Sequence, residues 1–515
     1  MALLRAAFCA ALVLLGTTLA AQDITLTSRD GEIEISGRFL GYDGEFYRID
    51  SKFGELTLDG SGVLCEGPAC PNLSDYVAEI SFSGASAMAS VLMPSLVEGF
   101  ALRNGYSVER RDVDSRHLVV ELSEQGQLAA RFRFRSTNTD EGFADLLANE
   151  ADIVMALREV RPDESRRAFE AGLGDLGAPA RNRVLALDAM VPVVAADNPL
   201  GMISTPALAQ VFAGEITNWT ELGGPDAPIS VHLVVAGSGL AQAAEDYLLG
   251  PAGLMLAPDV TLHDSGSDMV NAVTADPFSI GLASHAETGT ARVLTLTGGC
   301  GHRLAASRQT IKTEDYPLTT PMFLYLPARR LPKIGREFMG YLRSNMAQNV
   351  IRRVGLVDQA PESIGLQAQG DRFANAILAA GDEVTLAELQ RMVGFFMPMQ
   401  RLTHSFRFET GSTRPDAQSR TNIDLLAQAI EAGEFDGRRL VFVGFSDGDG
   451  PASANLRIAR ARAKAIQGAV LRKAQAADPG RVEVHIEAFG EALPMACDDS
   501  EWGRKVNRRV EVWVQ

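Results

Sequence analysis

Four apolar residues lead into a turn rich in glycine and aspartate in the stretch Leu440-Val441-Phe442-Val443-Gly444-Phe445-Ser446-Asp447-Gly448-Asp449-Gly450. The apolar residues predict a buried strand, and the glycines predict a turn that leaves the Asp447 carboxylate at its end. In the helix predicted for residues 455–476, Asn455 and Arg462 share one face. A carboxylate facing a guanidinium can hold a ligand that carries both an ammonium and a carboxylate group. An internal Asp447–Arg462 salt bridge explains the pair equally well.

Residues 402–515 predict a compact α/β domain around this stretch, because short apolar strands alternate with amphipathic helices. Strands are expected at 405–408, 439–445, 482–488 and 509–514, and helices at 416–432 and 455–476. The order of motifs resembles the OmpA-like peptidoglycan-binding domain. The residues that carry this resemblance are Phe406-Arg407-Phe408, the Asp447 turn, Ile458 with Arg462-Ala463, Gly490-Glu491 with Pro494, and Asn507-Arg508-Arg509-Val510-Glu511.

The resemblance implies a role for each polar residue of the turn and the helix. In that family, the aspartate of the turn and an arginine fifteen residues later clasp diaminopimelate of the peptidoglycan peptide stem, without a covalent bond. Asp447 and Arg462 stand at that spacing, with Asn455 as a supporting contact. Two positions depart from the family pattern. Asp449 replaces a frequent threonine, and Cys497 lacks the second cysteine that family members commonly carry in the last loop.

The preceding region, residues 76–361, predicts a larger α/β domain with two lobes, because short apolar runs alternate with amphipathic stretches. Two of its strand-to-helix junctions are rich in glycine and serine, namely Ser83-Gly84-Ala85-Ser86 and Gly237-Ser238-Gly239. Backbone N–H groups at the start of a helix favour anions, so two such junctions on opposite lobes could bind one anion. The alternative is that both junctions are ordinary helix caps and tight turns.

Several stretches of residues 77–355 resemble the phosphate-binding component of phosphate ABC importers, a type II periplasmic binding protein. The most specific is Val211-Phe-Ala-Gly-Glu-Ile-Thr-Asn-Trp219, supported by 151–156, 191–194, 280–282 and 316–317. This resemblance implies two lobes that close on a small anion such as phosphate or sulfate, with an ABC transporter or another envelope protein as a partner. The anion-binding residues it implies are Ser83, Ser86, Ala87, Arg158, Gly237, Ser238 and Gly239.

Three cleft positions depart from that family. Arg158 replaces a carboxylate, Val234 replaces an arginine and Leu240 replaces a threonine. A cleft carboxylate accepts a proton from a protonated phosphate and repels a fully ionised anion, so its loss removes that discrimination. The ligand could then be phosphate, sulfate, a carboxylate or none. Arg158 could equally be a solvated surface residue or part of an internal ion pair.

Residues 1–21 predict a signal peptide, since Arg5 precedes a ten-residue apolar run and a small-residue cleavage site. Export to the periplasm would expose the cysteines to oxidation. Cys65 and Cys70 then predict a local disulfide rather than two free thiols. Cys300 and Cys497 can pair only if distant segments meet, and the sequence leaves that open. No cysteine or histidine spacing matches a metal site.

The remaining segments complete a four-part organisation after the signal peptide. Residues 22–75 predict a small β module with hairpin turns, and residues 362–401 predict a helical connector. The formal net charge is −17, and residues 402–515 contain equal numbers of acidic and basic side chains. The excess negative charge therefore lies before residue 402, and it excludes nucleic acid as a partner.

The sequence predicts a periplasmic binding protein tethered to the cell wall or outer membrane, which captures or senses a small anion. No nucleophile, metal or cofactor motif is present in the sequence, so we expect no enzymatic activity. The alternative is a structural scaffold whose binding-protein domain has lost its ligand and contacts other proteins. A wall hydrolase would need a nucleophile or metal that the sequence does not offer.

Overall fold

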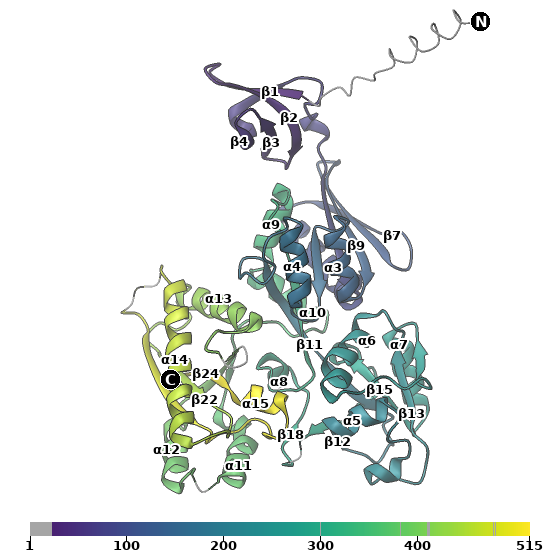
Figure 1. The fold of residues 1–515 in the computed structure, drawn as a ribbon, viewed down its shortest axis with the longest axis vertical. Coiled ribbons are helices and arrows are strands. Elements are labelled where there is room, and N and C mark those ends of the chain that lie inside the picture. Colours follow the sequence, from purple (N-terminus) through teal and green to yellow (C-terminus); the bar gives the residue numbers. More distant parts are fainter. Residues whose placement is uncertain (1–22, 299, 382, 409–411, 477, 479) are drawn as a thin grey trace, which may run out of the picture.

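The computed structural model describes residues 23–515 except 299, 382, 409–411, 477 and 479 (Figure 1). The predicted signal peptide lies outside the described residues. Among the helices of this described part, none has the length and apolarity needed to cross a membrane. Figure 1 shows a small β module at one end of the chain, two α/β lobes, and a C-terminal domain beside the lobes.

The N-terminal module is a five-stranded antiparallel sheet in the order β4-β3-β2-β1-β5. Its alternating side chains bury a small core that includes Ile24 and Tyr47. Cys65 and Cys70 form the predicted disulfide, with Cα atoms 5.9 Å apart. Arg336 ties the module to the first lobe by a 2.9 Å ion pair with Asp43. The strands are β1 (Asp23–Ser28), β2 (Glu34–Tyr42), β3 (Phe46–Ser51), β4 (Gly54–Asp59) and β5 (Val63–Glu66).

One sheet runs through both lobes, in the order β14-β13-β15-β11-β19-β10-β6-β9-β8-β7. Strand β11 (Asn182–Val194) joins the lobes, because its first half pairs with β19 (Thr319–Tyr325) and its last residues pair with β15 (Ser279–Ser284). Its thirteen residues are almost all buried, as expected for a strand covered on both faces. The bilobal type II fold follows from this shared strand.

The first lobe consists of the sheet from β10 to β7 with helices around it (Figure 1). Aromatic rings fill its core, with the Phe82 and Phe134 centroids 5.0 Å apart. Its elements are β6 (Ala78–Ala85), α2 (Met93–Asn104), β7 (Ser107–Asp112), β8 (His117–Glu124), β9 (Gln127–Thr137), α3 (Thr139–Leu147), β10 (Ile153–Ala156), α4 (Pro162–Glu170), α9 (Lys333–Tyr341) and α10 (Asn345–Arg353).

The second lobe packs its helices against β13, β14 and β15 and has a small separate sheet in the order β12-β17-β18. Trp219 is buried, and its indole N–H donates to the Phe278 carbonyl at 2.9 Å, so this residue is structural. The elements are β12 (Met202–Ser204), α5 (Thr205–Phe212), β13 (Ser230–Val234), α6 (Gly239–Ala244), β14 (Thr261–His263), α7 (Gly266–Ala275), β17 (Thr295–Thr297), β18 (Arg303–Leu304) and α8 (Arg308–Lys312).

The C-terminal domain is a mixed sheet in the order β20-β21-β24-β22-β23 with helices on both faces. The segment predicted as a connector does form two helices, and these pack onto this sheet, where the Phe396 ring lies 4.0 Å from that of Trp513. The elements are β20 (Ser363–Ile364), α11 (Gly370–Ala379), α12 (Leu386–Phe396), β21 (Gln400–Arg407), α13 (Ala417–Glu431), β22 (Arg439–Phe445), α14 (Ala452–Lys473), β23 (Glu483–Gly490), α15 (Glu501–Asn507) and β24 (Arg509–Val514).

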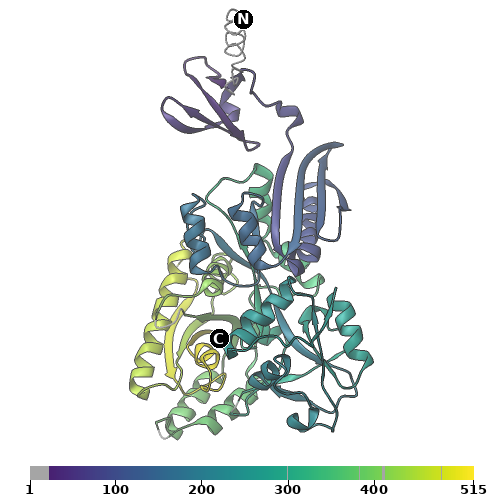
Figure 2. The ribbon, with the colours of Figure 1, turned by 45° about the vertical axis from the view of Figure 1, so that its right-hand side comes forward.

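A buried ionic cluster joins the C-terminal domain to the binding-protein domain, and both views place the two domains side by side (Figure 2). Arg401 on β21 donates to Asp315 at 2.7 Å and lies 3.4 Å from Glu511 on β24. Glu511 also accepts from Arg372 at 2.5 Å and from Arg509 at 2.7 Å. Burial alone would raise the pKa of Glu511, but the three arginines hold it far below its ordinary value.

We predict that Glu511→Gln destabilises the protein by about 3–5 kcal/mol, because three buried guanidinium groups lose their shared carboxylate. Scanning calorimetry measures the effect as a lower melting temperature. The contribution of Glu511 is present above the unfolded pKa near 4.3 and is lost only as the pH falls further, since the folded pKa is depressed. The matched control is Glu434→Gln, an exposed position where we expect almost no change.

Candidate functional sites

The site on the C-terminal domain depends on a close contact between a strand and a helix. A Cβ atom on Gly444 would lie 2.0 Å from the Ala459 carbonyl oxygen, so only glycine lets α14 approach β22 this closely. Asp447 follows the end of β22, and Arg462 lies one turn beyond Ala459 on α14. The contact therefore brings the carboxylate and the guanidinium to the same rim of the sheet.

Arg462 is buried, and its guanidinium has no ion-pair partner in the part of the chain that the structure describes. Among the described residues, no hydrogen bond or ion pair engages its side chain, and its Nε atom is buried. The guanidinium lies over the Phe408 ring, 5.2 Å from the centroid. Burial and the nearby Arg508 lower the pKa of Arg462, whereas Asp447 raises it. Asp447 is thus close enough to act on Arg462 electrostatically, although no Asp447–Arg462 salt bridge forms.

Asp447 is paired instead with Arg508, a residue to which the sequence analysis gave no role. Arg508 Nη1 donates to Asp447 at 2.7 Å, and its Nη2 donates to Glu501 at 2.9 Å. Asp447 therefore lies near two arginines, Arg462 and Arg508, and among the described residues it makes its ion pair with Arg508. The sequence signal for Arg508 was its place in the Asn507-Arg508-Arg509 motif.

Asn455 supports the rim from inside the fold. Its amide donates to Glu491 at 2.6 Å and to the Gly450 carbonyl at 3.3 Å, so it ties the loop after β23 to the Asp447 turn. On the other side, the backbone N–H of Gly448 donates to Asp498 at 2.8 Å. Both loops beside Asp447 are thus held in place by hydrogen bonds.

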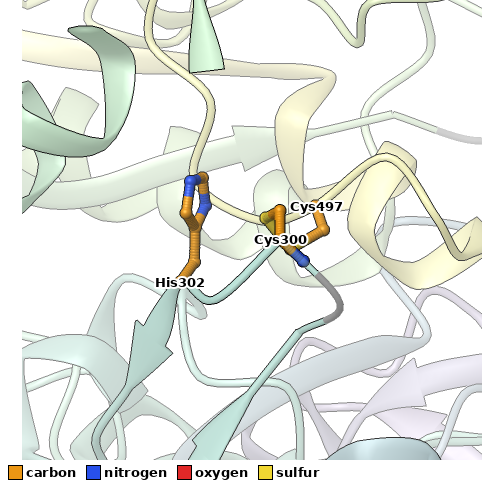
Figure 3. Close-up of side chains that lie close together, drawn as sticks. All are labelled: Cys300, His302 and Cys497. Atoms are coloured by element: carbon orange, nitrogen blue, oxygen red, sulfur yellow. A yellow bond between two sulfur atoms is a disulfide. The ribbon is translucent and has the colours of Figure 1, made fainter. Parts of the chain in front are cut away.

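A second disulfide connects this rim to the other domain (Figure 3). Cys497 precedes Asp498, and it is bonded to Cys300, with Cα atoms 5.6 Å apart. The sequence left this pairing open. In the structure the two cysteines are bonded, because the β17–β18 connection lies against the last loop. His302 lies beside the two sulfur atoms. A disulfide offers no thiolate, so in this oxidised state the cluster lacks the ligands that a zinc site needs.

The two glycine–serine junctions of the binding-protein domain meet at the interface of the lobes. The Ser86 hydroxyl accepts from the Gly239 N–H at 3.5 Å, and Ser238 caps α6 by accepting from Ala241 at 3.1 Å. Gly237 has a φ of +92°, which a glycine tolerates without strain. Ser238 is thus both a helix cap and a neighbour of the interlobe contact.

Two other predicted anion residues do not join that contact. Ser83 is buried and donates to Asp145 at 2.5 Å inside the first lobe. Ala87 is exposed at the start of the helical segment after Ser86. The structure therefore brings together Ser86, Ser238 and Gly239, and it engages Ser83 elsewhere.

Arg158 lies in an internal ion-pair cluster, one of the alternatives that the sequence left open. Its side chain donates to Asp140 and to Glu164 (2.7 Å), and its Nε lies 3.6 Å from Asp246. Burial alone would lower the pKa of Arg158. The hydrogen bonds that Arg158 donates to Glu164 and Asp140 have the larger effect and raise this pKa. The side chain is only 8% exposed, so the three carboxylates leave little of this cation for a ligand.

Leu157 faces Gly239 of the opposite lobe, whereas Arg158 approaches that lobe only at Asp246, inside its ion-pair cluster. The Leu157 Cδ1 atom would lie 3.2 Å from a Cβ on Gly239. The N–H of Thr139, at the start of α3, donates to Gln242 of α6 at 2.8 Å, and the Thr139 hydroxyl accepts from Leu157 at 3.0 Å. No motif in the sequence pointed to Leu157, Thr139 or Gln242. The signal for Thr139 was its place at a strand-to-helix junction, like that of Ser86.

A fold with two lobes that share a central strand and meet at helix N-termini defines the class of extracytoplasmic binding proteins. A family model of the PBP superfamily domain matches residues 73–345, and a model of the OmpA family matches residues 407–508. Since the first match covers more than half of the chain, the chain belongs to the PBP superfamily, and it carries a C-terminal OmpA domain. Both families imply a location outside the cytoplasm.

Curated relatives and a solved structure resemble this chain over the binding-protein region. Protein SphX of Synechococcus elongatus is 26% identical over 265 residues, which is 47% of this chain and 76% of that protein. The phosphate-binding protein PstS of Bacillus subtilis is 28% identical over 236 residues, 44% of this chain and 73% of its own. An ABC-type phosphate transport receptor from Vibrio cholerae, at 20% identity and a TM-score of 0.42, matches 54% of this chain and 99% of its own.

We predict that Arg158→Leu destabilises the protein by about 3–5 kcal/mol, because the buried Glu164 would lose its guanidinium partner and only Arg161 would remain to pair with Asp140 and Asp246. Denaturant titration measures the loss. Arg166→Leu is the control, since its pair with Glu170 is exposed and contributes little. A fully stable Arg158→Leu protein with altered anion affinity would instead assign Arg158 to the ligand.

Proposed function

We propose that this protein is a periplasmic binding protein that holds peptidoglycan noncovalently through its C-terminal domain and captures a small anion between its lobes. The predicted signal peptide would export it, and the OmpA domain would tether it to the wall next to the outer membrane. It would act without catalysis or cofactor. The observation that carries the proposal is the Arg462 guanidinium, which lies near Asp447 on the rim of the OmpA domain and has no partner among the described residues.

The chemistry of this rim suits diaminopimelate, whose free end carries an ammonium and a carboxylate on one carbon. Arg462 has no competing carboxylate among the described residues, so its N–H groups can donate hydrogen bonds to the ligand carboxylate. Asp447 can accept the ammonium when it exchanges its contact with Arg508, which keeps Glu501 as a second partner. The ligand carboxylate would then lie beside Arg462 and the ligand ammonium beside Asp447, so each charge on the ligand would face an opposite charge on the rim.

We predict that Asp447→Ala and Arg462→Ala, alone or combined, reduce cosedimentation with purified sacculi by at least about tenfold, since each removes a charge-assisted hydrogen bond to the ligand. Free diaminopimelate should compete with sacculi for the wild-type protein. Arg457→Ala is the matched control, because Arg457 is an exposed residue of the same helix. Wild-type sedimentation by the double variant would refute the tether.

For the anion, three groups converge at the lobe interface: the N–H groups of Thr139 and Gly239 and the hydroxyl of Ser86. The Gln242 carbonyl oxygen now accepts from Thr139, in the position that an oxygen of phosphate or sulfate would take at a helix N-terminus. An anion would therefore compete with the protein's own amide, and binding requires Gln242 to move away. A transporter or sensor protein would bind the conformation in which the lobes are closed.

The second candidate is a scaffold with no ligand, and one observation favours it. Leu157 packs across the lobe interface beside Gly239, and Gln242 satisfies the free N–H of the opposite helix. An apolar side chain and an internal hydrogen bond would keep the lobes closed without a ligand. In that case, the lobes would present a constant surface to another envelope protein.

Calorimetry separates the two candidates. We predict that Gln242→Ala binds phosphate or sulfate about tenfold more tightly than the wild type, because the Thr139 N–H no longer has an internal partner. Gln210→Ala, on helix α5 of the same lobe, serves as the control and should leave the affinity unchanged. Absence of heat for both the wild type and Gln242→Ala at millimolar anion would favour the scaffold.

A further inference from the structure

A large cavity lies between the binding-protein domain and the C-terminal domain, apart from both sites above. Its volume is about 970 Å³, and its walls come from strand β11, the α9–α10 region and helices α13 and α14. Figure 1 shows α13 next to the first lobe, and the Thr421 hydroxyl of α13 accepts from the Val184 N–H of β11 at 3.3 Å. The volume is in the range of pockets that hold small organic ligands, and it far exceeds the needs of a phosphate ion.

The cavity is basic although the chain as a whole is acidic. Five basic side chains and two acidic ones, Asp424 and Glu431, line it. Within the described residues, the side chains of Arg183 and Arg343 make no hydrogen bond or ion pair. Burial and then the charge of Arg343 lower the pKa of Arg183 to about 10, and Asp424 only partly offsets them. Asp424 makes its ion pair with Lys473 at 2.9 Å, so two neighbouring guanidinium groups that have no carboxylate in contact favour an anionic ligand.

One lining residue offers an unused amide. Gln359 is 2% exposed, and both its Nε2 and Oε1 atoms are buried without a hydrogen-bond partner. Its backbone is fixed, because its N–H donates to Gln348 at 2.8 Å and its carbonyl accepts from His404 at 3.2 Å. A buried amide of this kind costs free energy unless something pairs with it. Its free donor and acceptor are complementary to a peptide group.

Apolar side chains complete the wall next to these polar groups. Met339 and Leu342 line the cavity from the first lobe, and Ile423 lines it from α13. Such a wall suits the aliphatic part of a ligand, and it would leave an inorganic ion without contacts. The lining thus combines cations, an amide and an apolar surface.

We propose that this interdomain cavity binds a short acidic peptide, whose carboxylates pair with Arg183 and Arg343 and whose backbone amide pairs with Gln359. An aliphatic side chain of the peptide packs against Met339, Leu342 and Ile423. The site lies between the domains and is distinct from the Asp447 rim and from the lobe interface. Its occupation does not depend on the function proposed above.

Calorimetry on the full-length exported protein tests the site with the tetrapeptide Ala-Glu-Leu-Ala. The protein carries Asp447→Asn and Arg462→Gln, so that any heat comes from elsewhere than the rim. We expect saturable binding, and we expect the neutral peptide Ala-Gln-Leu-Ala amide to bind at least about tenfold more weakly. Equal binding of the neutral peptide, displacement of the peptide by millimolar phosphate or laurate, or no heat would overturn the proposal.

Variants then assign the residues. Gln359→Leu keeps the volume and removes an unpaired amide, so the melting temperature should not fall while peptide affinity drops about tenfold. Arg343→Ala, an exposed position that does not threaten folding, should weaken binding by a similar factor, and so should Arg183→Ala. The control is Arg353→Ala, an exposed arginine of α10 outside the cavity. Unchanged affinity in Gln359→Leu and Arg343→Ala would overturn the assignment.

Discussion

Arg401 lies buried between two carboxylates that belong to different domains, Asp315 and Glu511. A buried cation is tolerated only when carboxylates and hydrogen bonds replace its water, so the two domains must stay together to keep it paired. Arg407 reinforces the interface, since it donates to the Thr313 carbonyl at 3.0 Å and to Asp315 at 3.3 Å. The relative placement of the domains, and with it the cavity between them, depends on this cluster.

The C-terminal domain is held against the binding-protein domain by further contacts besides this ionic cluster. The helices of residues 370–396 pack onto its sheet, and the Cys300–Cys497 disulfide attaches its last loop to the second lobe. A crosslink over 197 residues strongly restricts the unfolded chain. Wall attachment and ligand capture would therefore take place on one connected body.

The sequence was sufficient for the motifs whose spacing is local, and it failed where partners come from afar. The strand of residues 439–445, Asp447 and the helical face of Arg462 were all predictable from apolar runs, glycines and helical period. The partner of Asp447 was not, because Arg508 lies 61 residues away and only the folded sheet brings it close. The Cys300–Cys497 pair was open for the same reason.

Leu157 and Arg158 follow the end of β10 and are adjacent in the sequence, but they have different surroundings. Leu157 lies against Gly239 of the other lobe, while the guanidinium of Arg158 enters a cluster of three carboxylates, Asp140, Glu164 and Asp246. An alignment to the family that is wrong by one residue here would therefore assign the site to Arg158 in place of Leu157. Carboxylates surround Arg158, so an anion bound at the lobe interface would depend on the N–H groups of Thr139 and Gly239. Neutral donors of this kind bind phosphate or sulfate through hydrogen bonds and helix dipoles, and they do not require a counter-ion in the cleft.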